Sequence, residues 1–573
     1  MIAIVPLLVL GLIVAGVVAL TRRRSDPFHA GAGGGGEGEL RRLFLYGVLF
    51  IALALTAVGA YGLLRLVLAG PEPVVGSNAD ELARNLAFVI VAAPVYALLW
   101  RSIRRRLADP EERASFGWSA FMAVTQLLAL VIAATALAEL IVVVLPVDQA
   151  WVDSTARFVV AGAVWGWHWW LFRQDGVRPT TGRALTLLGG SAFGLLVLSF
   201  AIGAMLVPLA ASAYERIFSE AIIGGSAEAV WRALAWTLTG GLVWFWYWLR
   251  HGLGLERSRL WHAYTLLLGV LVPLITMLTA AGTLLALVLV WTFGDTFGDG
   301  AVSWFEPVPP TLVIGLVALA VWAYHRMVLG TDAAVFRTEP GRIYRYLIAG
   351  AGLAAAAVGI GAIVSAAIEA LQPATAGEGP INTLLYGVTA LAVGGPVWWA
   401  SWRKAQAAAK ADPETELRSP SRRSYLVLWV GVVGVVALIA LIVTVYQFVE
   451  GALEGRSLVV VLNSARGAIG TLVAAGAIGA FHLAVWRSDR AAVPADAPRR
   501  IRHVLVVGGE DADRVAAEIR ERTGAHVAVW HRLDDGAVTL DTESVLERLA
   551  ELDEPRVLVV AEPGGPEVVP YRL

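Results

Sequence analysis

Six apolar segments of the chain end in a cluster of aromatic residues followed by an arginine, and this repeated ending allows few folds. The clearest copy is GLVWFWYWLR, at residues 241–250. The apolar blocks of the chain run for roughly 18–28 residues without a central charge, the length that an α-helix needs to cross about 30 Å of hydrocarbon. Backbone polar groups must be paired internally in lipid, so each block is expected to form a transmembrane helix. The other copies end at Arg101, Arg173, Arg326, Arg403 and Arg487.

Composition supports a membrane protein. Hydrophobic residues make up 57% of the 573 residues and charged residues only 16%, whereas soluble domains are nearer half apolar and a quarter charged. The chain has no cysteine, which excludes disulfides, thiolate catalysis and cysteine metal sites. The fold class is therefore an all-α polytopic membrane protein with a small C-terminal α/β domain.

The order of apolar blocks predicts about thirteen transmembrane helices. Residues 1–24 form an apolar run that ends in three arginines, as expected of an uncleaved anchor with its N-terminus outside. A glycine-rich linker, residues 25–40, leads to six two-helix hairpin repeats. We place these repeats at residues 41–110, 111–178, 179–255, 256–335, 336–410 and 411–487.

The distribution of basic residues sets the expected orientation. Loops assigned to the cytoplasm carry roughly 28 lysines and arginines and loops assigned outside carry roughly 6, as the positive-inside rule requires. Each repeat has an even number of spans, so every copy is expected to sit the same way up, as a parallel repeat. We therefore predict a multi-pass protein of the bacterial cytoplasmic membrane, with the C-terminal domain in the cytoplasm.

The pattern changes after a polar linker at residues 488–500. Residues 501–573 alternate short apolar strands with amphipathic helices, in the expected order βαββαβ. Strands are expected at residues 503–507, 526–533, 537–540 and 556–561, with a hairpin turn at residues 534–536. This order favours a ferredoxin-like fold, with an open α/β sheet as the alternative. The domain carries 15 acidic and 8 basic residues, which argues against nucleic acid as a partner.

The aromatic endings provide the first candidate binding residues. Their tryptophans are typical of a belt at the membrane interface, with the arginines anchored to lipid phosphates; an aromatic-lined binding site is the alternative. His168 and His482 both lie five residues before a closing arginine. We interpret them as interface histidines rather than as a pair of haem ligands. The tryptophans singled out are Trp165, Trp244, Trp248, Trp398 and Trp402.

A second candidate site lies at the outer ends of the helices. Arginines begin several returning helices, at Arg84, Arg157, Arg232 and Arg466. They are expected to reach lipid headgroups, or alternatively to pair with acids such as Glu139 and Glu369 in a ring. No helix centre carries a charge, which disfavours a proton-coupled pump.

The RRLFLY start at residues 41–46 and the repeated tryptophan–arginine endings resemble a family of bacterial multi-pass membrane proteins known only as a domain of unknown function. The resemblance covers roughly residues 40–487 and implies no activity.

The favoured function is a membrane-embedded scaffold or regulatory protein, whose partners are the lipid bilayer and a protein bound by the cytoplasmic domain. A transporter or channel is the alternative, with a polar cavity lined by Gln126, Ser191, Thr276, Thr389 and Gln447. A haem- or quinone-dependent enzyme is the third option. The sequence contains no catalytic constellation and no cofactor or metal motif, so we expect no enzyme activity and no cofactor. It leaves the oligomeric state open.

Overall fold

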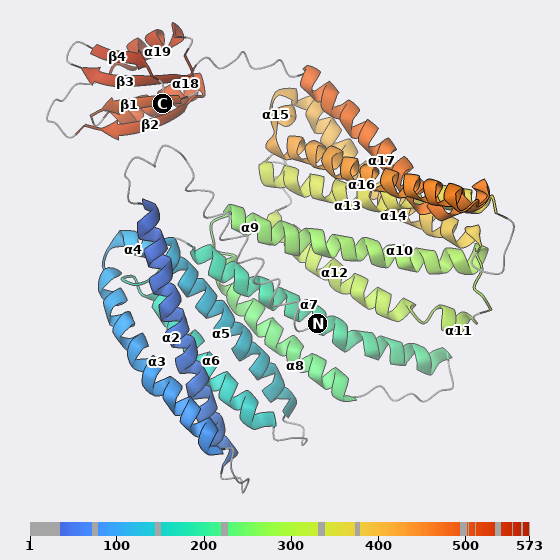
Figure 1. Cartoon of the computed structure of the whole chain (residues 1–573), viewed down its shortest axis with the longest axis horizontal. Helices are drawn as coiled ribbons and strands as arrows, with labels where there is room; N and C mark the ends of the chain where they lie inside the picture. The colour runs from blue at the N-terminus through green and yellow to red at the C-terminus, as the bar shows by residue number, and fades with distance from the viewer. Residues whose placement is uncertain are drawn as a thin grey trace. The chain divides into compact units, whose positions relative to one another are not determined.

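The structure is a computed structural model (Figure 1). It describes residues 35–70, 78–143, 150–180, 182–218, 227–298, 300–330, 338–372, 379–492, 501, 503–509, 511–532, 540–552, 554–562 and 565–571. The chain divides into a helical unit that ends at Trp486 and an α/β unit that begins at Arg487. The predicted anchor at residues 1–24 lies outside the described residues.

Long helices joined as hairpins make up the helical unit (Figure 1). They fall into three consecutive groups of four, which we name the first, middle and third groups. The first group is α2 (Gly35–Ala69), α3 (Asn78–Arg106), α5 (Phe116–Val143) and α6 (Ala150–Arg173). The middle group is α7 (Arg183–Phe218), α8 (Ala227–Trp244), α10 (Val272–Phe293) and α12 (Val308–Leu329). The third group is α13 (Glu339–Glu369), α14 (Pro380–Ala411), α16 (Pro420–Leu453) and α17 (Leu458–Ala492).

Short helices lie between the long ones. They are α4 (Pro110–Ala114), α9 (Arg259–Ala263), α11 (Ala301–Trp304) and α15 (Pro413–Arg418). In the middle group, a π-helical segment at Phe245–Gly252 extends α8, and a second at Tyr264–Leu271 runs into α10. Pro273, which lies inside one predicted span, sits at the start of α10 directly after this second segment. Local π-helix is a known way to relieve a disturbed hydrogen-bond ladder in a helix.

Ten helices of the described residues are long and apolar enough to cross a membrane. They correspond to ten of the twelve spans expected in the hairpins. The other two expected spans are helical, as α6 and as α8 with its π-helical extension. Tryptophan, histidine and charged side chains lower the apolar character of these two helices. The membrane-protein class is confirmed, while the count of thirteen remains a prediction.

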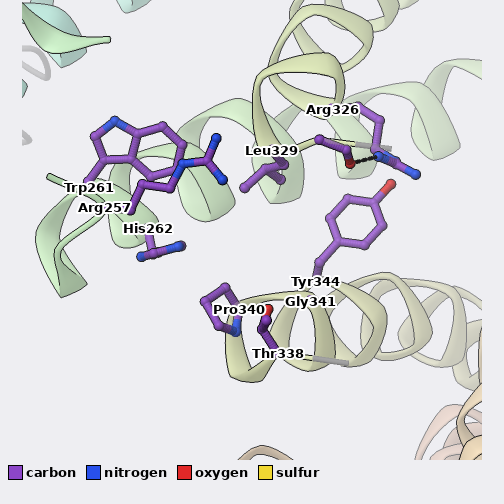
Figure 2. A pocket seen from close by; sticks show the side chains of 10 residues that line it. Arg257, Trp261, His262, Arg326, Leu329, Thr338, Pro340, Gly341 and Tyr344 are labelled. Atoms are coloured by element: carbon purple, nitrogen blue, oxygen red, sulfur yellow. Dashed lines mark hydrogen bonds between the residues drawn. The ribbon is translucent and has the colours of Figure 1, made fainter. Parts of the chain in front are cut away.

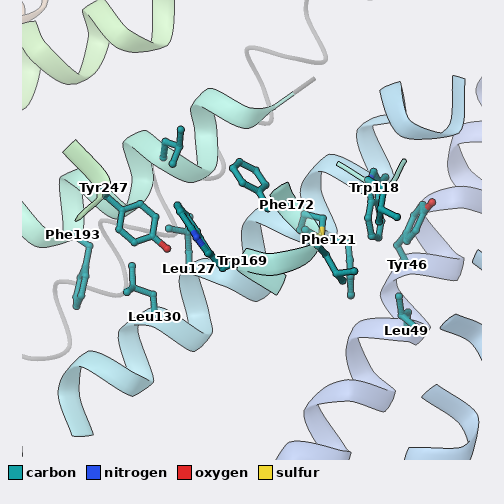
Figure 3. Packing of buried hydrophobic residues seen from close by; sticks show 14 of the residues in the cluster. Tyr46, Leu49, Trp118, Phe121, Leu127, Leu130, Trp169, Phe172, Phe193 and Tyr247 are labelled. Atoms are coloured by element: carbon teal, nitrogen blue, oxygen red, sulfur yellow. The ribbon is translucent and has the colours of Figure 1, made fainter. Parts of the chain in front are cut away.

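Glycines allow the closest helix contacts, as expected where lipid offers no hydrophobic drive for association. A Cβ atom on Gly352 of α13 would lie 2.5 Å from the backbone nitrogen of Trp398 on α14. A Cβ on Gly194 of α7 would lie equally near, 2.5 Å, to the backbone nitrogen of Trp244 on α8. Larger residues fill the space between hairpins, and one cluster runs from Tyr46 through Trp118 and Trp169 to Tyr247 (Figure 3).

The C-terminal unit contains strands β1 (His503–Gly508), β2 (His526–His531), β3 (Arg556–Glu562) and β4 (Gly565–Pro570). Its helices are α18 (Ala512–Thr523) and α19 (Thr542–Ala550). The sheet order is β2-β1-β3-β4, with β1 parallel to both β2 and β3, and β4 antiparallel to β3. The buried faces of the strands and helices form one apolar core, including Val504, Val515 and Val559.

The ferredoxin-like prediction is wrong, and the open α/β alternative is correct. In a ferredoxin-like fold another strand separates the two parallel strands of the first βαβ unit, whereas here β1 pairs directly and in parallel with β2. The predicted hairpin turn at residues 534–536 lies outside the described residues. The antiparallel strand is instead β4, which pairs with β3. The predicted strands near residues 503–507, 526–533 and 556–561 are confirmed as β1, β2 and β3.

Candidate functional sites at the ends of the helices

The same local arrangement begins the third helical segment of each group. Ser115, Ser258 and Ser419 precede α5, α9 and α16, and each hydroxyl accepts the backbone N–H three residues ahead. These N–H groups belong to Trp118, Trp261 and Arg422, at 3.2, 3.3 and 3.5 Å. A serine N-cap satisfies a backbone donor that the helix itself cannot pair. Because the three caps occupy equivalent positions, they allow the residues of the three groups to be compared position by position.

A buried histidine occupies the fourth helix of every group. His168, His325 and His482 are 1%, 0% and 0% exposed. In each, Nδ1 lies 2.8–2.9 Å from the backbone carbonyl four residues earlier. Because a carbonyl only accepts hydrogen bonds, Nδ1 carries the proton and neutral Nε2 is left as an acceptor. None of the three Nε2 atoms has a hydrogen-bond partner among the described residues.

Each histidine ring packs against an aromatic residue six positions after the capping serine. The ring centroids of His168, His325 and His482 lie 5.7, 5.8 and 5.7 Å from those of Phe121, Tyr264 and Tyr425. Both His168 and His482 are thus enclosed by protein, and their depth relative to the membrane surface stays a prediction. Each of the two rings packs on aromatic residues of its own group.

The third of these histidines, His325, was missed because it directly precedes the closing arginine instead of lying five residues before it. The aromatic spacing from the capping serines is the sequence signal that could have found the set.

The candidate tryptophans also face protein. Trp248 and Trp402 are 0% and 2% exposed and pack on Tyr264 and Tyr425 at 4.6 and 5.7 Å. An interface belt is therefore the wrong interpretation of these two.

The other three tryptophans are half-buried and make contacts to neighbouring helices. The indole N–H of Trp244 donates to the Tyr264 hydroxyl (3.2 Å), and that of Trp165 donates to the Tyr247 hydroxyl (2.7 Å). The Trp398 ring lies 5.7 Å from Phe481. All five candidates thus contribute to helix packing.

The first and third groups each have an ion pair with a buried glutamate at their arginine-rich end. Arg42 Nε donates to Glu112 at 2.9 Å, and the Tyr46 hydroxyl donates to the other oxygen of Glu112 at 2.7 Å. In the third group, Arg342 Nε donates to Glu416 at 3.0 Å, with both side chains less than a tenth exposed. Each glutamate precedes its capping serine by three residues.

The middle group has apolar residues where the other groups have this ion pair. Leu255 lies three residues before Ser258, in the position of the glutamates. Ala184 precedes Gly194 by ten residues, as Arg342 precedes Gly352. Ala184 and Leu255 both pack against the apolar cluster of the middle group. The middle group thus has two apolar side chains at the positions that carry Arg342 and Glu416 in the third group.

A cavity of about 250 Å³ lies beside this apolar replacement, between α9, the end of α12 and the start of α13 (Figure 2). Arg257, His262 and Arg326 supply its cationic and imidazole groups, and Trp261 and Tyr344 its aromatic walls. None of the described lining residues is acidic.

The guanidinium groups of this cavity lie against its aromatic walls. The Arg257 guanidinium carbon is 5.5 Å from the Trp261 ring centroid, and that of Arg326 is 5.2 Å from the Tyr344 ring centroid. Arg326 Nη1 also donates to the Gly330 carbonyl at 2.7 Å, the dashed line in Figure 2.

At the helix ends opposite to these ion pairs, the candidate arginines differ in their ion-pair partners. Arg157 forms an ion pair with Glu139, and Arg466 Nε lies 3.7 Å from Glu369. Both pairs connect different helices. Arg232 pairs instead with Glu228 on its own helix, and Arg84 is exposed, with no ion pair to a described residue. The arrangement is a set of local helix-to-helix links rather than a closed ring.

The polar residues proposed to line a channel do not share one cavity. Gln126 is fully buried in packed helices, and Ser191 donates to its own helix at Leu187. Thr276 and Gln447 are both half-buried. Thr389 lines a largely apolar groove of about 700 Å³ between α10, α13 and α14, whose described lining includes none of the other four.

These features define the class: a polytopic α-helical membrane protein with an appended α/β domain. Residues 42–150 and 342–477 match the model of a family described as a domain of unknown function (DUF5671), so the resemblance inferred from the sequence is confirmed. The matched regions contain the two buried ion pairs, and the region between them contains the apolar replacement. Neither the curated proteins nor the solved structures gave a match.

Proposed function

We propose that the protein is a membrane-embedded scaffold or regulatory protein, and that its C-terminal domain binds a protein partner in the cytoplasm. The observation that carries this proposal is that the groove lined by Thr389 includes none of the other four polar residues expected to line a solute path. Gln126 and Ser191 are enclosed, and the charged residues at the helix ends link neighbouring helices. Tightly packed helices of this kind are more typical of a membrane scaffold than of a channel or transporter.

The membrane part is proposed to consist of three copies of a four-helix unit, each made of two hairpins. The repeated capping serine, the buried histidine and the tyrosine or phenylalanine beneath it support this assignment. It groups the six predicted hairpins in pairs and keeps all copies in the same orientation. With the anchor, the chain would have thirteen spans, an outer N-terminus and an arginine-rich cytoplasmic side in a bacterial plasma membrane.

The C-terminal domain offers one surface suited to a partner. Strand β2 is an edge of the sheet, and Trp530 on it is 56% exposed. Edge strands can accept an added strand, and tryptophan is enriched among residues that dominate interface energies. The acidic balance of the domain, 15 acidic to 8 basic residues, favours a partner segment with basic residues. The opposite edge, β4, contains Pro566 and Pro570, which limit strand addition there.

Purification of the full-length chain from its own membranes with a mild detergent tests this function. A stoichiometric protein partner is expected to remain bound to the wild type and to be lost from a Trp530→Ala variant. Val569→Ala is the matched control, since Val569 is also exposed but lies on the opposite edge strand. A lone protein in every preparation, or equal loss from both variants, would contradict the proposal.

A transporter or channel is the second candidate. The groove that Thr389 lines favours it, because about 700 Å³ is enough for a small ligand. Its lining is dominated by alanine, leucine, valine and threonine, so a lipid or other apolar solute would fit it better than an ion. Stabilisation of the purified protein by one such solute, in the absence of any protein partner, would favour this candidate over the scaffold.

A further inference from the structure

The groove that Thr389 lines is bounded by small side chains from three helices. Gly282 and Ala286 come from α10, Ala354 from α13 and Ala390 from α14. Because α10 belongs to the middle group and the other two helices to the third, the groove lies between two groups. Its volume of about 700 Å³ falls within the range typical of small-molecule sites.

Four hydroxyl groups distinguish this groove from a purely apolar surface. Thr389 is 3% exposed, and its Oγ1 has no hydrogen-bond partner among the described residues. The hydroxyls of Thr279, Thr283 and Tyr386, which also line the groove, likewise form no hydrogen bond with a described residue. A hydroxyl that is removed from water without a partner costs free energy. A ligand in the groove would find these four groups unpaired.

Two other threonines of α10 provide an internal comparison. Thr276 and Thr292 are not part of the groove lining, and each donates to the carbonyl four residues earlier, at 3.0 and 2.7 Å. This local bond is a common way for a threonine within a helix to satisfy its hydroxyl. Thr279 and Thr283, on the same helix, do not form it. On α10, the threonines without this bond are therefore the two that line the groove.

Thr389 lies deep within its helix. It is nine residues after Pro380, where α14 begins, and 14 residues before Arg403, or about 14 and 21 Å along a helix axis. The hydrocarbon core of a bilayer is about 30 Å thick. The polar groups of a phospholipid stay near the bilayer surface, so only its acyl chains would reach this depth. A molecule that satisfies the Thr389 hydroxyl must therefore carry an oxygen atom into the apolar layer.

We infer that this groove binds an isoprenoid quinone. Such a molecule has two carbonyl oxygens on a flat, otherwise apolar ring, and each oxygen can accept a hydrogen bond from a threonine hydroxyl. Tyr386 and Trp304 add aromatic surfaces on which a flat ring can pack. Ile275 and Val358, which also line the groove, are 49% and 67% exposed. The hydrocarbon tail can therefore extend past them into the surrounding lipid.

This inference rests on the groove of the second candidate function and names the class of its ligand. It does not depend on a protein partner at the C-terminal domain. A protein that binds a quinone and also keeps its partner would be a scaffold with a bound ligand, so the inference and the scaffold proposal can fail separately.

Equilibrium binding of tritiated decylubiquinone to the full-length protein in phosphatidylcholine nanodiscs tests the inference. Saturable binding is expected above the partitioning into empty nanodiscs. Decylbenzene, which has a ring and the same tail but no carbonyl oxygen, is the competitor. It should displace the quinone about tenfold less well than unlabelled decylubiquinone, because it accepts no hydrogen bond from a threonine. Absence of saturable binding, or equal displacement by the two compounds, overturns the inference.

Variants assign the binding to this groove. Thr389→Val is expected to weaken quinone binding about three- to tenfold, because one hydrogen bond is lost. The variant should fold, since its hydroxyl has no partner among the described residues. Thr276→Val is the matched control, because the Thr276 hydroxyl bonds its own helix and is not part of the lining.

A third variant fills the groove without touching a hydroxyl. Ala354 is exposed and lines the groove, so Ala354→Leu adds apolar volume where the ring would lie and should abolish saturable binding. Equal affinities of the Thr389→Val and Thr276→Val variants, or unchanged binding by Ala354→Leu, would overturn the assignment to this groove.

Discussion

Glu416→Leu is expected to destabilise the helical unit by about 3 kcal/mol, since removal of one partner leaves the other charge of a buried pair uncompensated. Arg342 would keep only Glu339, whose side chain is more exposed than that of Glu416. The unfolding midpoint of purified protein in detergent measures the effect.

The middle group provides the control for this prediction. It carries alanine and leucine, Ala184 and Leu255, where the third group carries Arg342 and Glu416. A double variant, Arg342→Ala with Glu416→Leu, places the same two residue types in the third group. Its free energy of unfolding should be within about 1 kcal/mol of the wild type, because apolar replacement of a whole buried ion pair is often neutral. A double variant as unstable as Glu416→Leu would contradict the equivalence of the groups.

Gly352→Ala is expected to have the second large effect. The added Cβ would lie 2.5 Å from the Trp398 nitrogen and 2.8 Å from the Gly394 carbonyl oxygen. Both are backbone atoms, so α13 and α14 would have to separate. Overpacking of this kind costs about 1–3 kcal/mol or more, and the unfolding midpoint should fall accordingly.

Gly350→Ala is the matched control on the same helix. Its Cβ would meet nothing nearer than Trp429 Nε1 at 3.6 Å, an ordinary contact. Alanine favours helix over glycine by about 1 kcal/mol, so the midpoint should stay or rise. Similar losses from the two glycine variants would refute the close-approach explanation.

The sequence predicted the membrane class, the hairpins and three of the four strands because these follow from apolar length and local periodicity. It could not predict β4, since Gly565–Pro570 carries two prolines and pairs through tertiary contact with β3. The burial of Trp248 and Trp402 was also missed. An aromatic residue near a closing arginine has the same local pattern whether it faces lipid or another helix.

The ion pair of Glu112 could not be predicted from local sequence patterns either. Glu112 and Arg42 are 70 residues apart, and only the three-dimensional arrangement brings them together. The pair of Arg157 and Glu139 was easier to predict because both residues lie near one hairpin loop. The alignment of the three groups became visible only when the capping serines and buried histidines could be compared in space.

The most direct test of a packed scaffold against a solute path uses the absence of native cysteine. Single cysteines replace Gln126, Ser191 and Thr389, and membrane vesicles are treated from each side with a charged, membrane-impermeant thiol reagent. Asp175→Cys is the positive control, because Asp175 is highly exposed in a loop. We predict labelling at position 175 from one side and none at the other three positions. Labelling of two or more of those three positions would establish a water-filled path and contradict the scaffold.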